Sequence, residues 1–119
     1  MVEDSGAQSM TDSLQRQAQS LQETSPEKYG LLKAYHERVR EALEVCSRNY
    51  PSTKQLSENL PDSNMTPQMV GNLLALLVQF EIIEVFSERN NSNRYDLTHY
   101  DHKRMDTLCQ ILQRVTAGS

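Results

Sequence analysis

The sequence contains no tryptophan and only four glycines, four prolines and two cysteines in 119 residues. No apolar run approaches the roughly 18 residues of a membrane-spanning helix, so we expect no transmembrane segment. The first ten residues, MVEDSGAQSM, are acidic and lack an apolar stretch, so we expect that they are not a signal peptide. Cys46 and Cys109 fit free thiols in a cytoplasmic protein better than a disulfide scaffold.

Catalytic motifs are also missing. The chain has no nucleophile with a matching base, no phosphate-binding loop and no carboxylate pair at a recognisable spacing, so we expect no enzyme activity and no cofactor. No Cys/His cluster has the spacing of zinc ligands, and we expect no metal site. His99 and His102 are three residues apart near a predicted helix start, a pattern more typical of capping or of a surface.

Size and charge narrow the class further. A chain of this length predicts one domain, and its hydrophobic fraction of 37% is low for a self-sufficient globule. A partner subunit that completes the core is therefore an early expectation. The net charge of −4, taken alone, argues against a nucleic-acid-binding protein.

The chain divides into short polar breaks and amphipathic runs. Residues 1–10 are small and polar, and we expect a flexible end. Residues 11–24 predict a helix, and Ser25-Pro26 begin a second one that runs to about Asn49. Tyr50-Pro51 stop that helix, and Ser52 or Thr53 caps a short helix, KQLSENL.

The second half begins with a cap-and-proline signature at Thr66-Pro67, which predicts a fourth helix to about Gln79. Two alternating runs, IIEVF and RYDLT, then predict a hairpin with a long polar tip. Asp101 is expected to cap a last helix that ends near Thr116.

The resulting order is helix, long helix, short helix, turn, helix, hairpin, helix. In this order, and in the stretch STKQLSENLPDSNMTPQMVGNLLALLVQFEIIEVFSERNNSNRYDLT, the chain resembles winged helix-turn-helix regulators of the MarR and PadR type over residues 26–116. The resemblance implies a mainly α fold with a small β hairpin (α+β). It also implies one domain over 11–119, with a DNA-binding core at 26–98 and dimerisation helices at 11–24 and 100–116.

Arginine outnumbers lysine eight to four, and with the acidic balance this is similar to haloarchaeal oxidative-stress regulators of that family. The resemblance implies a cytoplasmic homodimer that binds double-stranded DNA and responds to oxidants. Cys46 and Cys109 are the candidate sensor thiols, and buried structural thiols are the alternative. Residues 48–98 contain four basic and six acidic side chains, which is a poor balance for DNA binding in dilute salt. In molar salt long-range attraction is screened, so we expect close hydrogen bonds, shape fit and bound salt cations to carry the binding.

We expect the fourth helix to contact the DNA bases. Thr66, Gln68 and Asn72 lie on its polar side, and Gln68 and Asn72 are four residues apart on one face. Both amides can bond the N6/N7 edge of adenine in the major groove. An ordinary polar helix face is the alternative. Gly71 and Ala75 beside them have almost no side chain and would let a backbone approach.

The hairpin tip and the start of the short helix are the expected flanking contacts. Arginine suits a narrow minor groove, and asparagine suits phosphates and tight turns. A solvated loop is the alternative for the tip, a pairing of Arg94 with Asp96 or Glu88 is the alternative for that arginine, and capping is the alternative for Ser52. The predicted contacts are Arg89, Asn90, Asn91, Asn93 and Arg94 in the tip, and Arg48, Ser52, Thr53 and Lys54 as phosphate ligands.

Two apolar seams predict the homodimer, because neither has an obvious internal partner in a three-helix winged core. Pairing them between subunits would place two reading helices about 34 Å apart, one turn of DNA. Folding back onto the same subunit is the alternative. The seams are Leu14, Ala18 and Leu21, and Met105, Leu108, Leu112 and Val115.

A second class of function competes with DNA reading. In it the same helix face meets a protein, and the domain is a winged-helix interaction module. The acidic surface favours this reading, whereas the Gln68/Asn72 pair and the arginines of the tip favour DNA.

Overall fold

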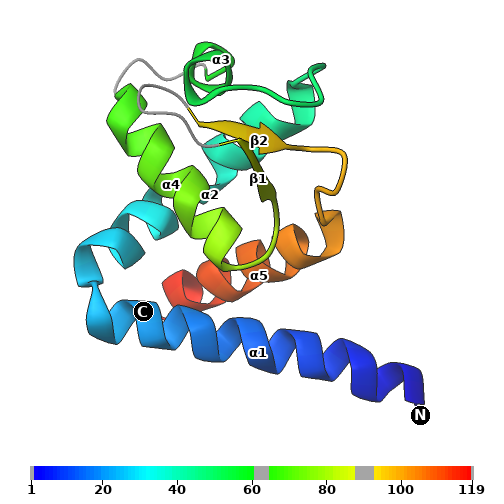
Figure 1. Cartoon of the computed structure of the whole chain (residues 1–119). Helices are drawn as coiled ribbons and strands as arrows, with labels where there is room; N and C mark the ends of the chain where they lie inside the picture. The colour runs from blue at the N-terminus through cyan, green and yellow to red at the C-terminus, as the bar shows by residue number, and fades with distance from the viewer. Residues whose placement is uncertain (1, 61–64, 88–92, 119) are drawn as a thin grey trace.

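The computed structural model describes residues 2–60, 65–87 and 93–118, with side chains described from Met10 to Gln113. Within these ranges the chain is mainly helical and carries one small antiparallel hairpin, in the predicted order (Figure 1). The elements are α1 (Val2–Thr24), α2 (Pro26–Val45), α3 (Thr53–Glu58), α4 (Pro67–Gln79), β1 (Glu84–Ser87), β2 (Arg94–Asp96) and α5 (His102–Gly118).

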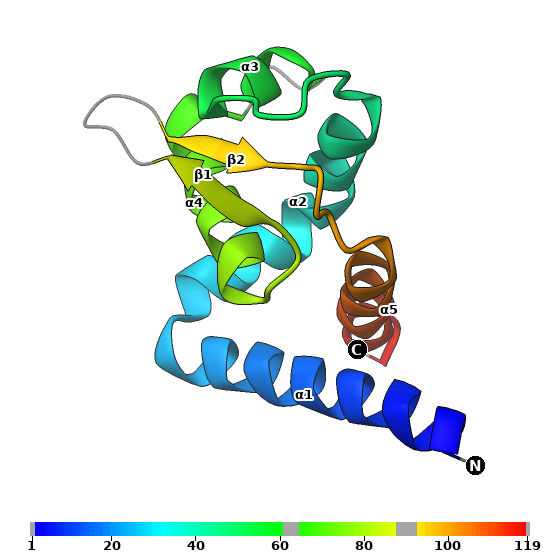
Figure 2. The ribbon, with the colours of Figure 1, turned by 45° about the vertical axis from the view of Figure 1, so that its right-hand side comes forward.

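The first helix is longer than predicted. α1 begins at Val2, so the predicted helix start at Thr11 is wrong, while the flexibility of the first ten residues stays a prediction. That segment has no proline and one glycine, and nothing in it forces a helix to stop. In both ribbon views α1 runs along the base of the molecule beneath α5, and its N-terminal turns extend past the rest of the body (Figures 1 and 2).

The second helix is shorter than predicted. α2 ends at Val45, and its cap residue Cys46 is already extended. The cause lies in two hydrogen bonds from the β2 side of the chain: Tyr95 N–H donates to the Pro51 carbonyl and Leu97 N–H to the Asn49 carbonyl, both at 2.9 Å. An isolated bridge also pairs Ser52 with Arg94. Residues 49–52 are therefore drawn alongside β2 instead of continuing the helix.

The hairpin keeps the predicted alternation. Val85 faces Tyr95 and Glu84 faces Asp96 in the antiparallel register, which becomes irregular between Val85 and Ser87. Tyr95 is buried and Val85 half-buried, so one face of the hairpin closes over the core. Figure 2 shows β1 and β2 beside α4, with the end of β2 leading to α5.

The two apolar seams lie inside one chain. Leu14, Leu108 and Leu112 are 0% exposed, and Ala18 and Leu21 are 3% and 7% exposed. Met105 belongs to the same buried cluster. The prediction that these seams lack an internal partner is therefore wrong: α1 and α5 pack against each other and α2, which is the fold-back alternative. These side chains are not available to a second subunit, and the Val115 side chain lies outside the described residues.

The end of α4 is fixed to α5 by a hydrogen-bonded turn. Ile82 N–H donates to Leu77 and Glu81 N–H to Val78, both at 2.9 Å, so the two amides close a Schellman motif. Glu81 has a φ of 62°, the left-handed conformation that this motif requires. Arg104 of α5 donates from Nε and Nη2 to the Phe80 carbonyl at 3.0 and 2.9 Å. The guanidinium thus satisfies a carbonyl at the negative end of α4.

Candidate nucleic-acid interface

The exposed face of α4 is made of short polar and small side chains. Gln68, Asn72, Ala75 and Gln79 are all exposed, on one stripe of the helix. The opposite side, with Val70, Leu73, Leu74 and Leu77, is at most 1% exposed. The prediction that the polar side of this helix points outward is confirmed. α4 lies on the outside of the molecule in Figure 1.

The N-terminal end of α4 is capped as predicted. Thr66 accepts a hydrogen bond from Met69 N–H at 3.1 Å, and Pro67 occupies the first helical position. α4 contains no charged residue, because its sequence is PQMVGNLLALLVQ. An approaching ligand would therefore meet amides, a neutral surface and the positive end of the helix dipole.

Gly71 does not belong to this exposed face. A Cβ built at Gly71 would lie 3.7 Å from Cγ2 of Thr53, so the glycine faces α3. That distance is an ordinary van der Waals contact, so the packing of α3 on α4 would accept a Cβ here, and Gly71 does not face an approaching external backbone. Thr53 is half-buried in the same contact.

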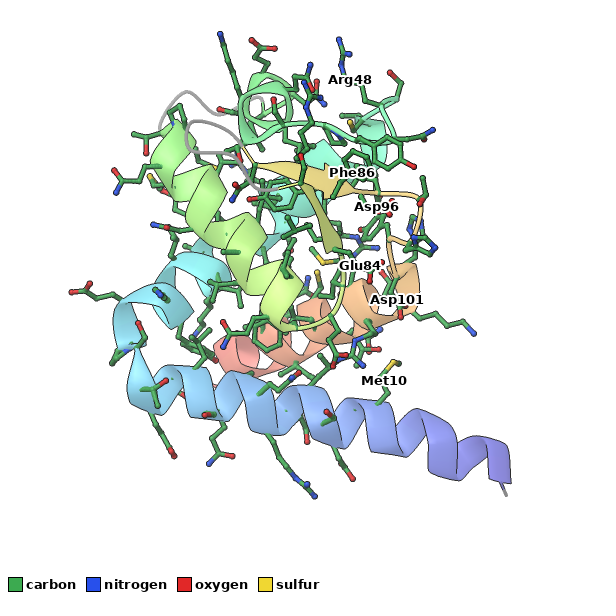
Figure 3. The ribbon with its side chains drawn as sticks, viewed as in Figure 1. Met10, Arg48, Glu84, Phe86, Asp96 and Asp101 are labelled. Carbon is green, nitrogen blue, oxygen red and sulfur yellow. The ribbon has the colours of Figure 1, made fainter. Side chains whose placement is uncertain are left out.

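The predicted phosphate ligands at the start of α3 separate into two groups. Ser52 is 8% exposed, and its hydroxyl accepts from Gln55 N–H at 3.2 Å, while the Gln55 side chain accepts from Ser52 N–H at 3.0 Å. This capping box is the structural alternative that the sequence left open for Ser52. Lys54 and Arg48 are exposed, and Arg48 points outward beside α3 (Figure 3).

The hairpin tip falls largely outside the described residues, which include neither Arg89, Asn90 nor Asn91. Asn93 is half-buried. Arg94 is exposed and donates from Nη1 to the Tyr50 carbonyl at 3.0 Å. This bond connects β2 to the segment that leads into α3. Arg94 is therefore exposed to solvent and also has a structural role.

An exposed aromatic pair lies next to this bond, and sequence reasoning missed it. The ring centroids of Tyr50 and Phe86 are 4.1 Å apart, and the residues are 39% and 54% exposed. Phe86 points away from the core because it alternates with Val85 along β1. The pair forms only because residues 49–52 lie beside β2, a long-range contact that no local pattern predicts.

A second group missed from the sequence lies at the base of the hairpin. The side chains of Glu84, Asp96 and His99 approach one another where β1 and β2 meet the turn before α5. Figure 3 shows Glu84 and Asp96 in this region, above Asp101. Asp96 Oδ1 accepts from Thr98 N–H at 2.9 Å and from the Thr98 hydroxyl. The hydroxyl bond is the main cause that lowers the pKa of Asp96 below its ordinary value.

The two thiols differ in environment. Cys109 is 2% exposed, and burial raises its pKa despite the nearby Arg40 guanidinium. Cys46 is half-buried, and its thiol donates to the Arg48 carbonyl at 3.6 Å. A sensor thiol needs exposure and a lowered pKa, and Cys109 has neither.

Charge is distributed unevenly along the chain. Residues 46–80, which contain α3 and α4, carry Arg48 and Lys54 against Glu58 and Asp62, so their formal charge is zero. The net charge of −4 therefore comes entirely from the rest of the chain. The candidate interface is neutral, with two exposed cations at its α3 end.

In the part of the chain that the structure describes, no helix combines the length and apolarity needed to span a bilayer. Comparison of the sequence with protein-family models and curated proteins, and of the structure with solved structures, gave no match, so a function must be argued from these residues.

Proposed function

We propose that the chain is a sequence-specific regulator of the winged helix-turn-helix class that reads double-stranded DNA with α4. The observation that carries the proposal is the exposed amide pair Gln68 and Asn72 on a helix that has no charged residue and lies between α3 and the hairpin. Two amides one turn apart match the paired donor and acceptor edges of bases in the major groove.

The neighbours of α4 support this reading. α3 precedes it with a capping box, and the hairpin follows it through the hydrogen-bonded turn at Glu81. The bridge between Ser52 and Arg94 adds a third short extended segment beside the hairpin. This order of helix, extended segment, two helices and hairpin is the layout of a winged helix, in which the second helix of the pair reads the groove.

The charge distribution indicates how such binding would work. Three described cations are exposed: Arg48 before α3, Lys54 in α3 and Arg94 in β2. If each meets one phosphate, the logarithm of affinity falls with the logarithm of salt with a slope of about −3 per chain. A slope steeper than about −6 per chain would contradict the idea that hydrogen bonds at a neutral face dominate.

The homodimer stays a prediction, and it needs a surface other than the two buried seams. Two half-sites one turn apart would still require two chains on the DNA. Light scattering of the free protein at micromolar concentration tests this part separately. A monomer in solution that binds one half-site would remove the dimer from the proposal and keep the reading helix.

The oxidative signal also stays a prediction. Of the two thiols, Cys46 is the more accessible and lies at the junction of α2 with the segment leading to α3. Cys46→Ser should abolish any oxidant-dependent change in DNA affinity, while Cys109→Ser should not. An unchanged oxidant response in Cys46→Ser would exclude that thiol as the sensor.

The decisive experiment begins with selection from random duplex DNA at both low and molar KCl, followed by affinity measurements on the selected site. Gln68→Ala with Asn72→Ala should weaken binding by about 2–6 kcal/mol, since one good base contact contributes about 1–3 kcal/mol. α1 supplies a matched control, because Gln15 and Gln19 are also exposed amides four residues apart. Gln15→Ala with Gln19→Ala should leave affinity unchanged. Equal losses in both double variants, or no selected site, would reject the proposal.

The exposed Tyr50/Phe86 pair favours a second candidate, a protein-interaction module without DNA readout. Exposed aromatic side chains are enriched at protein interfaces, and the neutral α4 face lacks the cations typical of DNA-binding surfaces. Phe86→Ser should then abolish partner binding, and the α4 double variant should leave the weak, non-specific DNA affinity unaltered.

A further inference from the structure

We propose that Glu84, Asp96 and His99 form a binding site for a divalent transition-metal ion such as Zn²⁺. The three residues come from β1, β2 and the turn before α5, and each offers one ligand atom. The inference does not depend on DNA binding, and it concerns a different part of the molecule from the exposed face of α4.

The geometry of the three ligand atoms fits a single ion. His99 Nδ1 lies 3.2 Å from Asp96 Oδ2 and 3.6 Å from Glu84 Oε2. All three ligand atoms lie within 4.8 Å of one another. In a tetrahedral zinc site with nitrogen and oxygen ligands, bonds of about 2.0–2.1 Å place neighbouring ligand atoms about 3.3 Å apart. The histidine distances bracket that value, so small side-chain movements suffice to enclose the ion.

The strand register explains why a cation would be favoured at this place. Glu84 and Asp96 are directly paired across the hairpin, and like charges in that relation destabilise a sheet. The hairpin nevertheless brings them together, with His99 beside both. A divalent ion between the two carboxylates converts this repulsion into attraction.

Thr98 prepares Asp96 for this role. It binds Asp96 Oδ1 through both its N–H and its hydroxyl, and Asp96 Oδ2 is the oxygen that faces His99. Such hydrogen bonds to the non-coordinating atom of a ligand orient it and raise metal affinity. Glu84 and His99 are 67% and 69% exposed at their side chains, so the ion can enter from solvent and retain water as its fourth ligand.

The donor set selects the class of metal. Imidazole nitrogen suits Zn²⁺, Co²⁺, Ni²⁺ and Cu²⁺, whereas Mg²⁺ and Ca²⁺ prefer oxygen ligands alone. A bound ion would join both strands of the hairpin to the turn that starts α5. It would therefore fix the angle of the hairpin relative to the helices.

The test uses the full chain without an affinity tag, stripped with chelator and titrated with ZnCl₂ by calorimetry and against a chromophoric zinc indicator. We expect one Zn²⁺ per chain, with MgCl₂ giving no competition. His99→Ala and Glu84→Gln should each weaken binding at least about tenfold. The His99 imidazole resonances should shift on zinc addition. Both residues are exposed, so circular dichroism should show an unchanged fold.

Matched controls separate this site from adventitious binding. His102→Ala removes the neighbouring exposed histidine, which lies against the Tyr100 ring, and should leave zinc affinity unchanged. Cys46→Ser tests whether the half-buried thiol is the ligand instead. The proposal is overturned if the wild-type chain binds no zinc at about 100 μM protein, or if His99→Ala binds as well as wild type. A loss confined to His102→Ala or Cys46→Ser would also overturn it. If any of these outcomes is found, His99 serves only as a local charge partner for the two carboxylates.

Discussion

α1 and α4 are built alike, and the comparison shows which feature of α4 points to a ligand. Each helix buries an apolar seam in the same core, and each exposes two amides four residues apart. The outer face of α1 also exposes Asp12, Arg16 and Glu23, whereas α4 has no charged residue. An amide pair on an outer face is thus no signal by itself. α4 differs from α1 in two ways: it has no charged residue, and it lies between α3 and the hairpin.

The buried leucines of α1 and α4 should give the largest loss of stability. Leu14 in α1 and Leu73 in α4 are both 0% exposed, so each substitution to alanine should destabilise the chain by about 2–5 kcal/mol. Chemical denaturation at two protein concentrations measures both losses. If Leu14 lies in the core of one chain, the midpoint for Leu14→Ala does not depend on concentration. A concentration-dependent midpoint that Leu14→Ala abolishes would restore the α1 seam as a dimer interface.

The contact between the end of α4 and α5 should give the next largest loss of stability. Arg104→Met keeps much of the aliphatic stem and removes both hydrogen bonds to the Phe80 carbonyl, so the loss should be about 1.5–3 kcal/mol. The matched control is Lys103→Met, an exposed neighbour on the same helix, which should change stability by less than about 0.5 kcal/mol. Equal effects of the two variants would show that the Arg104 bonds contribute nothing measurable. Thermal or urea unfolding provides the measurement.

The caps of the two regions differ in a way that can be measured. Thr66 caps α4 with a side-chain hydrogen bond, whereas Ser25, at the end of α1, makes no side-chain cap bond to α2. Thr66→Ala should therefore cost about 1 kcal/mol and Ser25→Ala only a few tenths. Both positions carried the same cap-and-proline signature in the sequence. Similar losses in urea denaturation would mean that Ser25 forms its cap in solution.

The sequence predictions were right where the interaction is local in the sequence and wrong where it joins distant segments. Local signals were sufficient for element order, for the Thr66 and Asp101 caps and for the outward face of α4. The predicted end of α2 at Asn49 was wrong, because residues 46–49 lead into the segment that pairs with β2 instead of continuing the helix. The prediction that the two apolar seams lack an internal partner was also wrong, because hydrophobic periodicity predicts which side chains are buried but not which element packs on them.

The candidate sites show the same limit. The amide pair on α4 lies within one helix, so its spacing was readable from the sequence. The Tyr50/Phe86 pair and the Glu84, Asp96 and His99 group each depend on strand register between distant segments. The sequence predicted the alternation in the two strands but not their register, which places Val85 opposite Tyr95 and Glu84 opposite Asp96.

The smallest predicted effect concerns the residue that ends α4. Glu81 holds a φ of 62° in the Schellman motif, a conformation that glycine adopts without steric cost. Glu81→Gly should stabilise the chain by about 0.5–1 kcal/mol, the relief of strain being partly offset by the greater freedom of glycine in the unfolded state. Removal of a carboxylate from the negative end of a helix also favours folding, so the charge must be controlled. Glu81→Ala removes that charge and keeps the strained φ. If glycine stabilises the protein in urea denaturation and alanine does not, backbone strain is the cause. An equal gain from both would assign the effect to charge and not to the backbone conformation of Glu81.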